Sequence, residues 1–338
     1  MKGIISSIEP LSFPFKTLDP FLFCVYHKDS YPAGDDKMQA PRSGNGADFN
    51  PTAPYRMYHG DRIPGFPQHP HRGFETITAT TQGIIDHTDS CGNAGRYGNG
   101  DLQWMTAGRG VVHGEMFPLI HQDRPNPLTL FQIWLNLPKV SKMVEPAFAM
   151  HWAEEVPTHT TEDGKARLTI WAGSYRDQKA LAPTPNSWAT NPAAHVGVYL
   201  LVLQPGGRLT LPGVSAAGQA VNRAAYFIEG THLQINGETV PPSSSATLDA
   251  TQDAEFVNNS SGGEVSEVLV LQGAPIGEPV AQQGPFVMNT AGEIQEAFAD
   301  YRRTQFGGWP WPQDAMVFPR EQGRFALQQG VKTTPPQK

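Results

Sequence analysis

The chain has 338 residues, more than a single hydrophobic core usually supports, so its length predicts two domains. Hydrophobic residues make up 39% and charged residues 17%, a composition that argues against global disorder. The formal net charge of −7 argues against direct binding to nucleic acid or to an anionic membrane, both of which need a basic surface.

The cysteines and the hydropathy pattern indicate the compartment. Only Cys24 and Cys91 are present, too few for a disulfide framework, and this favours a reducing environment. No uninterrupted apolar stretch approaches the length that spans a membrane, and the apolar run at the start is too short for a signal peptide. We therefore expect a soluble cytoplasmic protein, or a nuclear one if the source is eukaryotic.

Frequent turn residues and short alternating segments predict an all-β protein. The 34 glycines and 31 prolines suit many short strands joined by turns. Aromatic residues alternate between Phe13 and Phe23, which predicts an edge or covering strand. Residues 28–58 are rich in Pro, Gly, Ser and Asp and show no period, so we interpret them as a loop insertion. This insertion is either a lid over a site or a disordered segment.

Two pairs of metal-ligand residues follow this loop. His69 and His71 are two residues apart, and so are His113 and Glu115. Because alternate residues of a β-strand point to the same face, two strands could direct three imidazoles and one carboxylate to one point. Such a donor set suits Fe(II), Mn, Co, Ni, Cu or Zn, so the spacing does not select the ion.

Glu75 has the same parity as His71 and is a fifth ligand candidate, unless a bulge at Gly73 changes that parity. Lone histidines in strands are more often hydrogen-bonded or surface residues than ligands. We interpret eight in that way: His27, His59, His87, His121, His151, His159, His195 and His232.

The remaining pattern predicts two β-rich domains and a C-terminal helix. Further strands are predicted near residues 84–88, 101–105, 128–135, 168–172, 195–203, 208–211, 224–228 and 265–271, with a hairpin turn at Asn236-Gly237. The second half lacks both ligand pairs, so we expect no second metal there. Helical spacing over 293–301 predicts a helix that docks on a barrel. We place a metal-binding domain at 1–150, a second barrel at 151–285, and the helix and tail at 286–338.

Three motifs resemble the pirin family: His69-Pro-His71-Arg-Gly-Phe-Glu75-Thr, Gly100-Asp-Leu-Gln-Trp-Met-Thr-Ala-Gly-Arg-Gly110 and His113-Gly-Glu115-Met. Pirins belong to the cupin superfamily. The resemblance therefore implies a bicupin, with two antiparallel jelly-roll β-barrels, a few short helices and one metal in the first barrel. By position, it assigns four ligands: His69, His71, His113 and Glu115. Glu75 would then lie beside the ligands. The segment 28–58 and the tail after Gly308 depart from the family.

The resemblance also implies a function, a quercetinase-type dioxygenase that holds one mononuclear ion, Fe(II) before other divalent metals, and opens the ring of a flavonol such as quercetin. Its partners would be a small aromatic substrate and dioxygen, and the chain would be a monomer. Glu115 would act as ligand and base. Five aromatic residues could line the pocket, although most of them suit core packing too: Phe66, Phe74, Trp104, Phe117 and Trp134.

Two alternatives stay open. The first is a non-enzymatic, iron-dependent redox-sensing module that binds a protein partner as a transcriptional or metabolic co-regulator. The second is a cupin whose metal serves only stability. A solvent channel lined by aromatic residues that reaches the metal would favour catalysis. A surface that responds to metal oxidation would favour the redox-sensing module.

Overall fold

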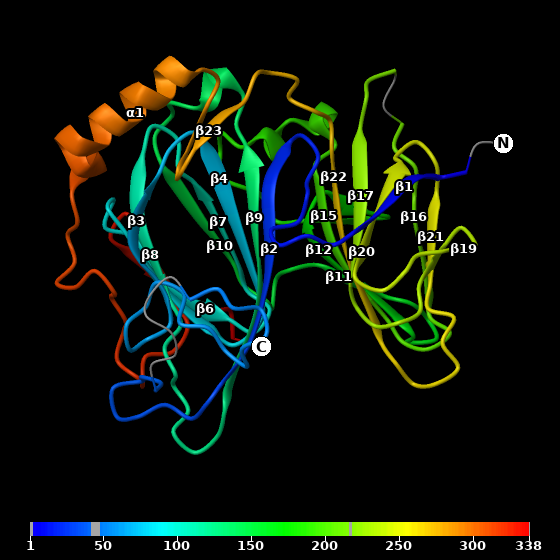
Figure 1. The fold of residues 1–338 in the computed structure, drawn as a ribbon, viewed down its shortest axis with the longest axis horizontal. Coiled ribbons are helices and arrows are strands. Elements are labelled where there is room, and N and C mark those ends of the chain that lie inside the picture. The colour runs from blue at the N-terminus through cyan, green and yellow to red at the C-terminus, as the bar shows by residue number, and fades with distance from the viewer. Residues whose placement is uncertain (1–2, 42–47, 216–217, 338) are drawn as a thin grey trace. The chain divides into compact units, whose positions relative to one another are not determined.

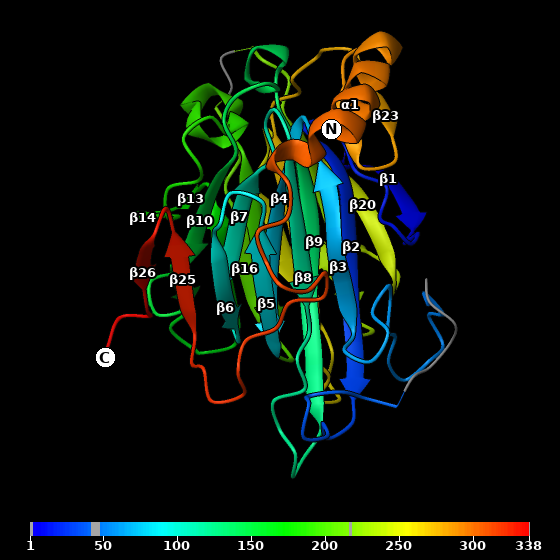
Figure 2. The ribbon, with the colours of Figure 1, turned by 90° about the vertical axis from the view of Figure 1, so that its left-hand side faces the viewer.

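The structure is a computed structural model that describes residues 3–41, 48–215 and 218–337. The chain forms two compact units, which Figures 1 and 2 show as ribbons of β-strands. Unit 1 contains residues 1–24 and 155–277, and unit 2 contains residues 25–154 and 278–338. The predicted all-β bicupin class is confirmed. Part of the predicted loop insertion, residues 42–47, lies outside the described residues.

Unit 2 is built from two antiparallel sheets. One has the order β10-β7-β4-β9-β2 and the other the order β26-β25-β6-β5-β8-β3. Aromatic and aliphatic side chains fill the core of this unit, among them Tyr97, Phe117 and Leu130. The strands of these sheets are β2 Phe21–Tyr31, β3 Gly65–His71, β4 Phe74–Gln82, β5 Ile84–Asp89, β6 Ala94–Gly98, β7 Leu102–Thr106, β8 Val111–Met116, β9 Asn126–Asn136, β10 Ala147–His151, β25 Phe325–Gln328 and β26 Val331–Thr333.

Strand β9 shows how the sequence pattern produces this unit. Buried and half-buried residues alternate along it, as expected for a strand with one face on the core. The alternation changes parity at Leu130 and Phe131, which are both buried. A bulge in the pairing with β4, between Thr80 and Gln82, lies opposite this point. Both faces of this part of β9 are therefore covered by protein.

Unit 1 has a seven-stranded sheet of order β1-β20-β17-β22-β15-β12-β11 and a four-stranded sheet of order β16-β21-β18-β19. Their apolar faces enclose a core of aliphatic and aromatic residues. Asn236 and Gly237 have positive φ between β18 and β19, so the predicted hairpin turn is confirmed. The strands of this unit are β1 Ile5–Pro10, β11 Thr158–Thr160, β12 Ala166–Ala172, β13 Ser174–Tyr175, β14 Gln178–Lys179, β15 Gly197–Leu203, β16 Arg208–Leu211, β17 Asn222–Glu229, β18 Gln234–Ile235, β19 Glu238–Thr239, β20 Ser244–Asp249, β21 Ala254–Val257 and β22 Ser266–Gly273.

The predicted C-terminal helix is present as α1 (Ala291–Thr304). A capping box begins it, because Thr290 and Glu293 each bond to the other's backbone N–H. Ile294 and Ala297 are buried against the hairpin β23 Ala281–Gln283 and β24 Phe286–Met288. The helix therefore docks on unit 2, as its apolar face predicts.

Short 3₁₀ turns occupy Lys139–Ser141, Trp188–Thr190, Pro192–Ala194 and Gln305–Gly307.

The tail after Gly308 also packs on unit 2. Trp311 Nε1 donates a hydrogen bond to the carbonyl of Asp89, and β25 pairs with β6. The guanidinium of Arg96, which is buried, pairs with Asp86 and donates to three tail carbonyls at 2.7–2.9 Å, those of Phe318, Pro319 and Gln322. These contacts anchor the tail on unit 2.

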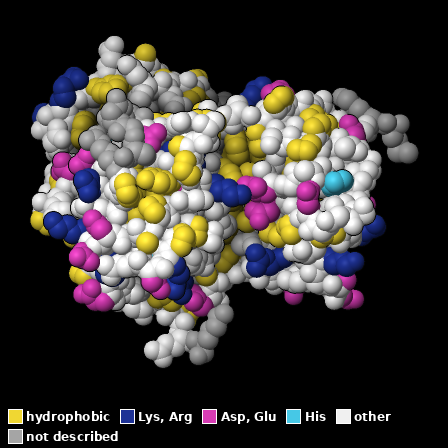
Figure 3. Space-filling view, turned by 60° about the horizontal axis from the view of Figure 1, so that its bottom comes forward, with side chains coloured by type: hydrophobic (Ala, Val, Ile, Leu, Met, Phe, Trp, Pro, Cys, Tyr) yellow, Lys and Arg dark blue, Asp and Glu magenta, His cyan; other side chains and the backbone are white. Residues whose placement is uncertain are grey.

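Residues 1–24 differ from the predicted division, which had placed them in the metal-binding domain. Strand β1 pairs with β20, and Asp19 accepts hydrogen bonds from the backbone of Ile276 and Gly277, so the part of this segment before β2 packs within unit 1. Acidic and basic side chains are interspersed on the face that Figure 3 shows. No helix in the described part of the chain has the length and apolar character needed to cross a membrane.

Candidate metal centre

Three histidines converge in unit 2. His69 and His71 lie on β3, His113 lies on β8, and these antiparallel strands place His69 directly opposite His113. One ring nitrogen from each histidine lies within 4.8 Å of the other two. The ring centroids are 4.5 to 5.0 Å apart. The period-two spacing therefore produces the predicted convergence of imidazoles.

Hydrogen bonds orient two of these rings. His69 Nδ1–H donates to the carbonyl of Pro67 at 2.8 Å, and His71 Nδ1–H donates to the carbonyl of Pro285 at 3.3 Å. Each bond leaves Nε2 with a free lone pair, as in histidines that bind a metal. Neither nitrogen of the buried His113 has a hydrogen-bond partner within the described residues. Since buried polar atoms normally have partners, these orphaned nitrogens fit a metal ion.

Burial keeps the three imidazoles neutral. It lowers the pKa of His69 to about 4, and it lowers the pKa values of His71 and His113 well below their usual range. Repulsion from the neighbouring histidines acts in the same direction. A neutral imidazole is the form that binds a transition metal, so this site does not need to lose protons before it binds one near neutral pH.

Glu115 lies beside the three histidines. Its carboxylate accepts hydrogen bonds from Thr78 Oγ1 at 3.0 Å and Gln132 Nε2 at 2.8 Å, and Glu115 Oε2 is 4.0 Å from His113 Nε2. Burial raises the pKa of Glu115, while the nearby His87 and these hydrogen bonds oppose the rise. The structure therefore brings all four expected ligands together and adds two side chains that hold the carboxylate.

Glu75 and Trp104 point away from this cluster. Thr78, which reaches Glu115, is paired across the sheet with Gln103, whereas Trp104 is paired with Ile77. Alternate residues of a strand face opposite sides, so Glu75, Ile77 and Trp104 share the other face of the sheet. Gly73, with φ +87° between β3 and β4, resets the parity that had suggested Glu75 as a ligand. The geometry therefore does not support Glu75 as a ligand or Trp104 as pocket wall.

The other aromatic residues predicted for the pocket do lie near the histidines. Phe74 and Trp134 pack on each other at 4.3 Å, and their rings are 5.0 and 5.4 Å from that of His71. Phe66 is 6.2 Å from His69 and 6.2 Å from Phe117. Aromatic side chains thus lie beside both His71 and His69, and Phe117 packs next to Phe66.

His87 is a site residue that the sequence analysis missed. It lies on β5 directly opposite Glu115, and its ring is 5.5 Å from that of His113. The ring stacks on Phe148, is fully buried, and has Nε2 3.5 Å from Asp89 Oδ2. Because a lone histidine gives no spacing signal, only the pairing of β5 with β8 could have revealed it.

The segment predicted as an insertion contributes to the site as well. Tyr58 stacks on Phe66 at 5.0 Å, and Phe49 lies 6.4 Å from Phe66. Tyr58 OH donates to Asp29 Oδ2 at 2.8 Å, and Asp29 forms a buried ion pair with Arg56 at 2.9 Å. These bonds tie the two ends of the segment together. Its described part therefore packs against Phe66, the neighbour of His69.

Comparisons with known proteins identify relatives of the chain. Residues 14–135 match the family described as Pirin, and residues 199–307 match the Pirin C-terminal cupin domain. The chain is 36% identical to Pirin-1 of Arabidopsis thaliana over 72% of this chain and 78% of that protein. It is 32% identical to human Pirin over 77% of this chain and 83% of that protein.

A solved structure also resembles the chain. It is a quercetin 2,3-dioxygenase from Acinetobacter baumannii, with 30% sequence identity and a TM-score of 0.68. The similarity covers 86% of this chain and 87% of the other.

Proposed function

The chain belongs to the pirin family, and on that premise we propose that it is a mononuclear metal dioxygenase that opens the ring of flavonols such as quercetin. The observation that carries this proposal is the donor set in unit 2. Three neutral imidazoles with nitrogens within 4.8 Å of one another stand beside the buried carboxylate of Glu115. His69, His71, His113 and Glu115 would hold the ion, which we take to be Fe(II).

A bound ion of this kind would supply Lewis acidity toward the substrate hydroxyl and would promote the reaction of the electron-rich ring with dioxygen. The protein would contribute the base. Glu115 would accept the proton of the flavonol 3-hydroxyl group, and in the metal-free site burial raises the pKa of its carboxylate. The hydrogen bonds from Thr78 and Gln132 keep that carboxylate in place while the proton moves.

Aromatic side chains would position the substrate. Phe74 and Trp134 flank His71, and Phe66 flanks His69. Flat rings beside both His71 and His69 suit a flat polyphenol, since stacked and edge-to-face contacts both favour it. They also exclude water from the place where the ring would open.

The test is anaerobic reconstitution with Fe(II), followed by addition of oxygen and a flavonol. Bound metal and the loss of flavonol absorbance are measured for wild type, His113→Ala, Glu115→Gln and a control, Glu145→Gln, whose side chain is 72% exposed and distant from the ligands in sequence. Turnover that is lost in the first two variants and kept in the third supports the proposal. Stoichiometric metal without turnover of any flavonol refutes it and favours the redox-sensing module. No bound metal refutes the site.

A further inference from the structure

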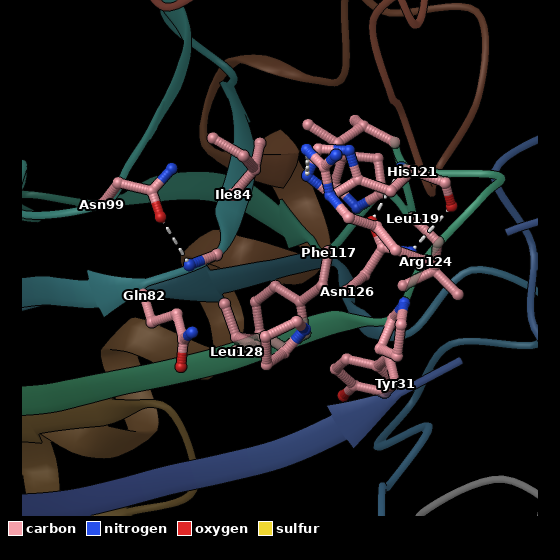
Figure 4. Close-up of a pocket in the computed structure, with 15 residues that line it drawn as sticks. Tyr31, Gln82, Ile84, Asn99, Phe117, Leu119, His121, Arg124, Asn126 and Leu128 are labelled. Carbon is pink, nitrogen blue, oxygen red and sulfur yellow. Dashed lines mark hydrogen bonds between the residues drawn. The ribbon is translucent and has the colours of Figure 1, made fainter. Parts of the chain in front are cut away.

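A second concave site occurs in unit 2, apart from the metal centre. It is a cavity of about 280 Å³ at the ends of β2 and β4 and the starts of β5 and β9 (Figure 4). None of the four expected metal ligands lines it. Phe117, two residues after Glu115 on the chain, lines it, and its ring lies 6.2 Å from that of Phe66, which neighbours His69. We propose that this cavity binds a small aromatic carboxylate.

The walls fit a flat apolar body. Ile84, Phe117, Leu119 and Leu128 line the cavity together with the rings of three prolines at 118, 125 and 127. Phe117, Leu119 and Leu128 are almost fully buried, so their positions are set by the core. A cavity of this size accepts a ligand with one aromatic ring, and a phenyl ring of Phe117 offers it a stacking or edge contact.

Most polar groups around the cavity are already occupied. Asn126 bonds to the backbone of His121 and Pro32 through both its oxygen and its nitrogen. Tyr31 OH donates to the carbonyl of Arg56 at 2.6 Å, and Asn99 Oδ1 accepts from the N–H of Gly83 at 3.0 Å. These bonds shape the cavity and leave few side chains of the wall to bind a ligand.

Arg124 is the charged group that remains. It lies at the rim with His121, and Figure 4 shows these two residues grouped with Leu119. The Arg124 side chain is 62% exposed, its ion pair to the exposed Asp123 is 4.0 Å long, and its Nη2 lies 3.4 Å from His121 Nε2. Both contacts are long and lie at the surface, so the guanidinium can exchange them for a ligand carboxylate at little cost. None of the described lining residues is acidic.

A second guanidinium adds positive charge behind the wall. Arg320 donates to the carbonyls of Leu119 and Ile120, which both line the cavity. The positive charge of Arg320 offsets the partial negative charge of these carbonyl oxygens, which lowers their repulsion of an anion. A guanidinium presents two parallel N–H donors that match a carboxylate. The guanidinium of Arg124 at the rim, above the apolar side chains of the wall, therefore suits an aromatic monocarboxylate.

The test uses 4-fluorobenzoate as the probe and ¹⁹F NMR line broadening as the measurement, on the full chain with bound metal and again after a chelator. Arg124→Gln should weaken binding by about tenfold, the loss expected for a charge-assisted bond. Ile84→Trp should abolish it by filling the cavity. Arg208→Gln is the matched control, because that side chain is 67% exposed in unit 1 and also pairs with an exposed carboxylate. It should bind as wild type does.

Three results would overturn the proposal. The first is the absence of broadening in wild type after the chelator, since the probe would then have bound only at the metal. The second is wild-type affinity in both Arg124→Gln and Ile84→Trp. The third is equal binding of the neutral 4-fluorobenzamide, because the site would then not select an anion. Because the measurement after chelation needs no turnover, failure here is distinguishable from failure of the dioxygenase proposal.

Discussion

Acidification should destabilise the metal-free protein through its buried histidines. Burial lowers the pKa of His69 from the ordinary 6.5 to about 4. Above 6.5 neither the folded nor the unfolded chain carries this proton. Between 6.5 and 4 only the unfolded chain binds it, so the free energy of unfolding falls as the pH falls. Below 4 both states bind it and the loss stops.

The magnitude follows from the same values. Each pKa unit corresponds to about 1.36 kcal/mol, so at about pH 5, roughly 1.5 units below the ordinary value, His69 alone costs about 2 kcal/mol. His71 and His113 add losses of the same sign, because burial lowers their pKa values too. His27, which is not among the expected ligands, has a pKa lowered by burial to about 3 and adds another loss.

The assay is urea unfolding of chelator-treated protein, followed by tryptophan fluorescence at about pH 7.5 and about pH 5. His69→Gln should remove about 2 kcal/mol of the pH-dependent loss, and His27→Gln should remove a similar amount. The two variants differ in metal binding, which only His69→Gln should weaken. If wild type and His69→Gln lose the same free energy between the two pH values, the reasoning from burial is wrong.

Three other substitutions test separate parts of unit 2. Arg96→Met leaves the buried Asp86 without its ionic partner, so it should lower the free energy of unfolding by about 3 to 5 kcal/mol. It also removes the hydrogen bonds to the tail carbonyls and should speed proteolysis of the tail. An unchanged melting temperature would contradict this. Lys142→Met leaves three buried oxygen acceptors without the ammonium group that donates to them, so urea unfolding should show a free energy of unfolding lower by about 3 kcal/mol. An unchanged free energy of unfolding would mean that water replaces the ammonium fully. The Phe49 side chain is 39% exposed and packs near Phe66. Phe49→Ala should raise the KM for a flavonol several-fold and change the free energy of unfolding by less than about 1 kcal/mol. An unchanged KM would exclude Phe49 from the substrate wall.

The sequence predicted the features that depend on residues close together in the chain. Two histidines with one residue between them point to one face of any regular strand, and this local fact placed His69 and His71 together. The hairpin turn at Asn236-Gly237 was predicted from these two residues alone, because both readily adopt the positive φ that the turn requires. The helix after Thr290 was predicted in the same way, because its apolar residues recur with helical period. Motif resemblance then supplied the family.

The tertiary structure decided what depends on pairing between distant segments. Gly73 adopts a conformation that turns Glu75 away from the histidines, and parity counted along the chain cannot include such a turn. His87 lies in the site because β5 pairs with β8, which places it opposite Glu115. Residues 1–24 pack in unit 1 for the same reason, since β1 finds its partner more than 230 residues later in β20. Strand pairing is a contact between segments, and neither segment specifies it alone.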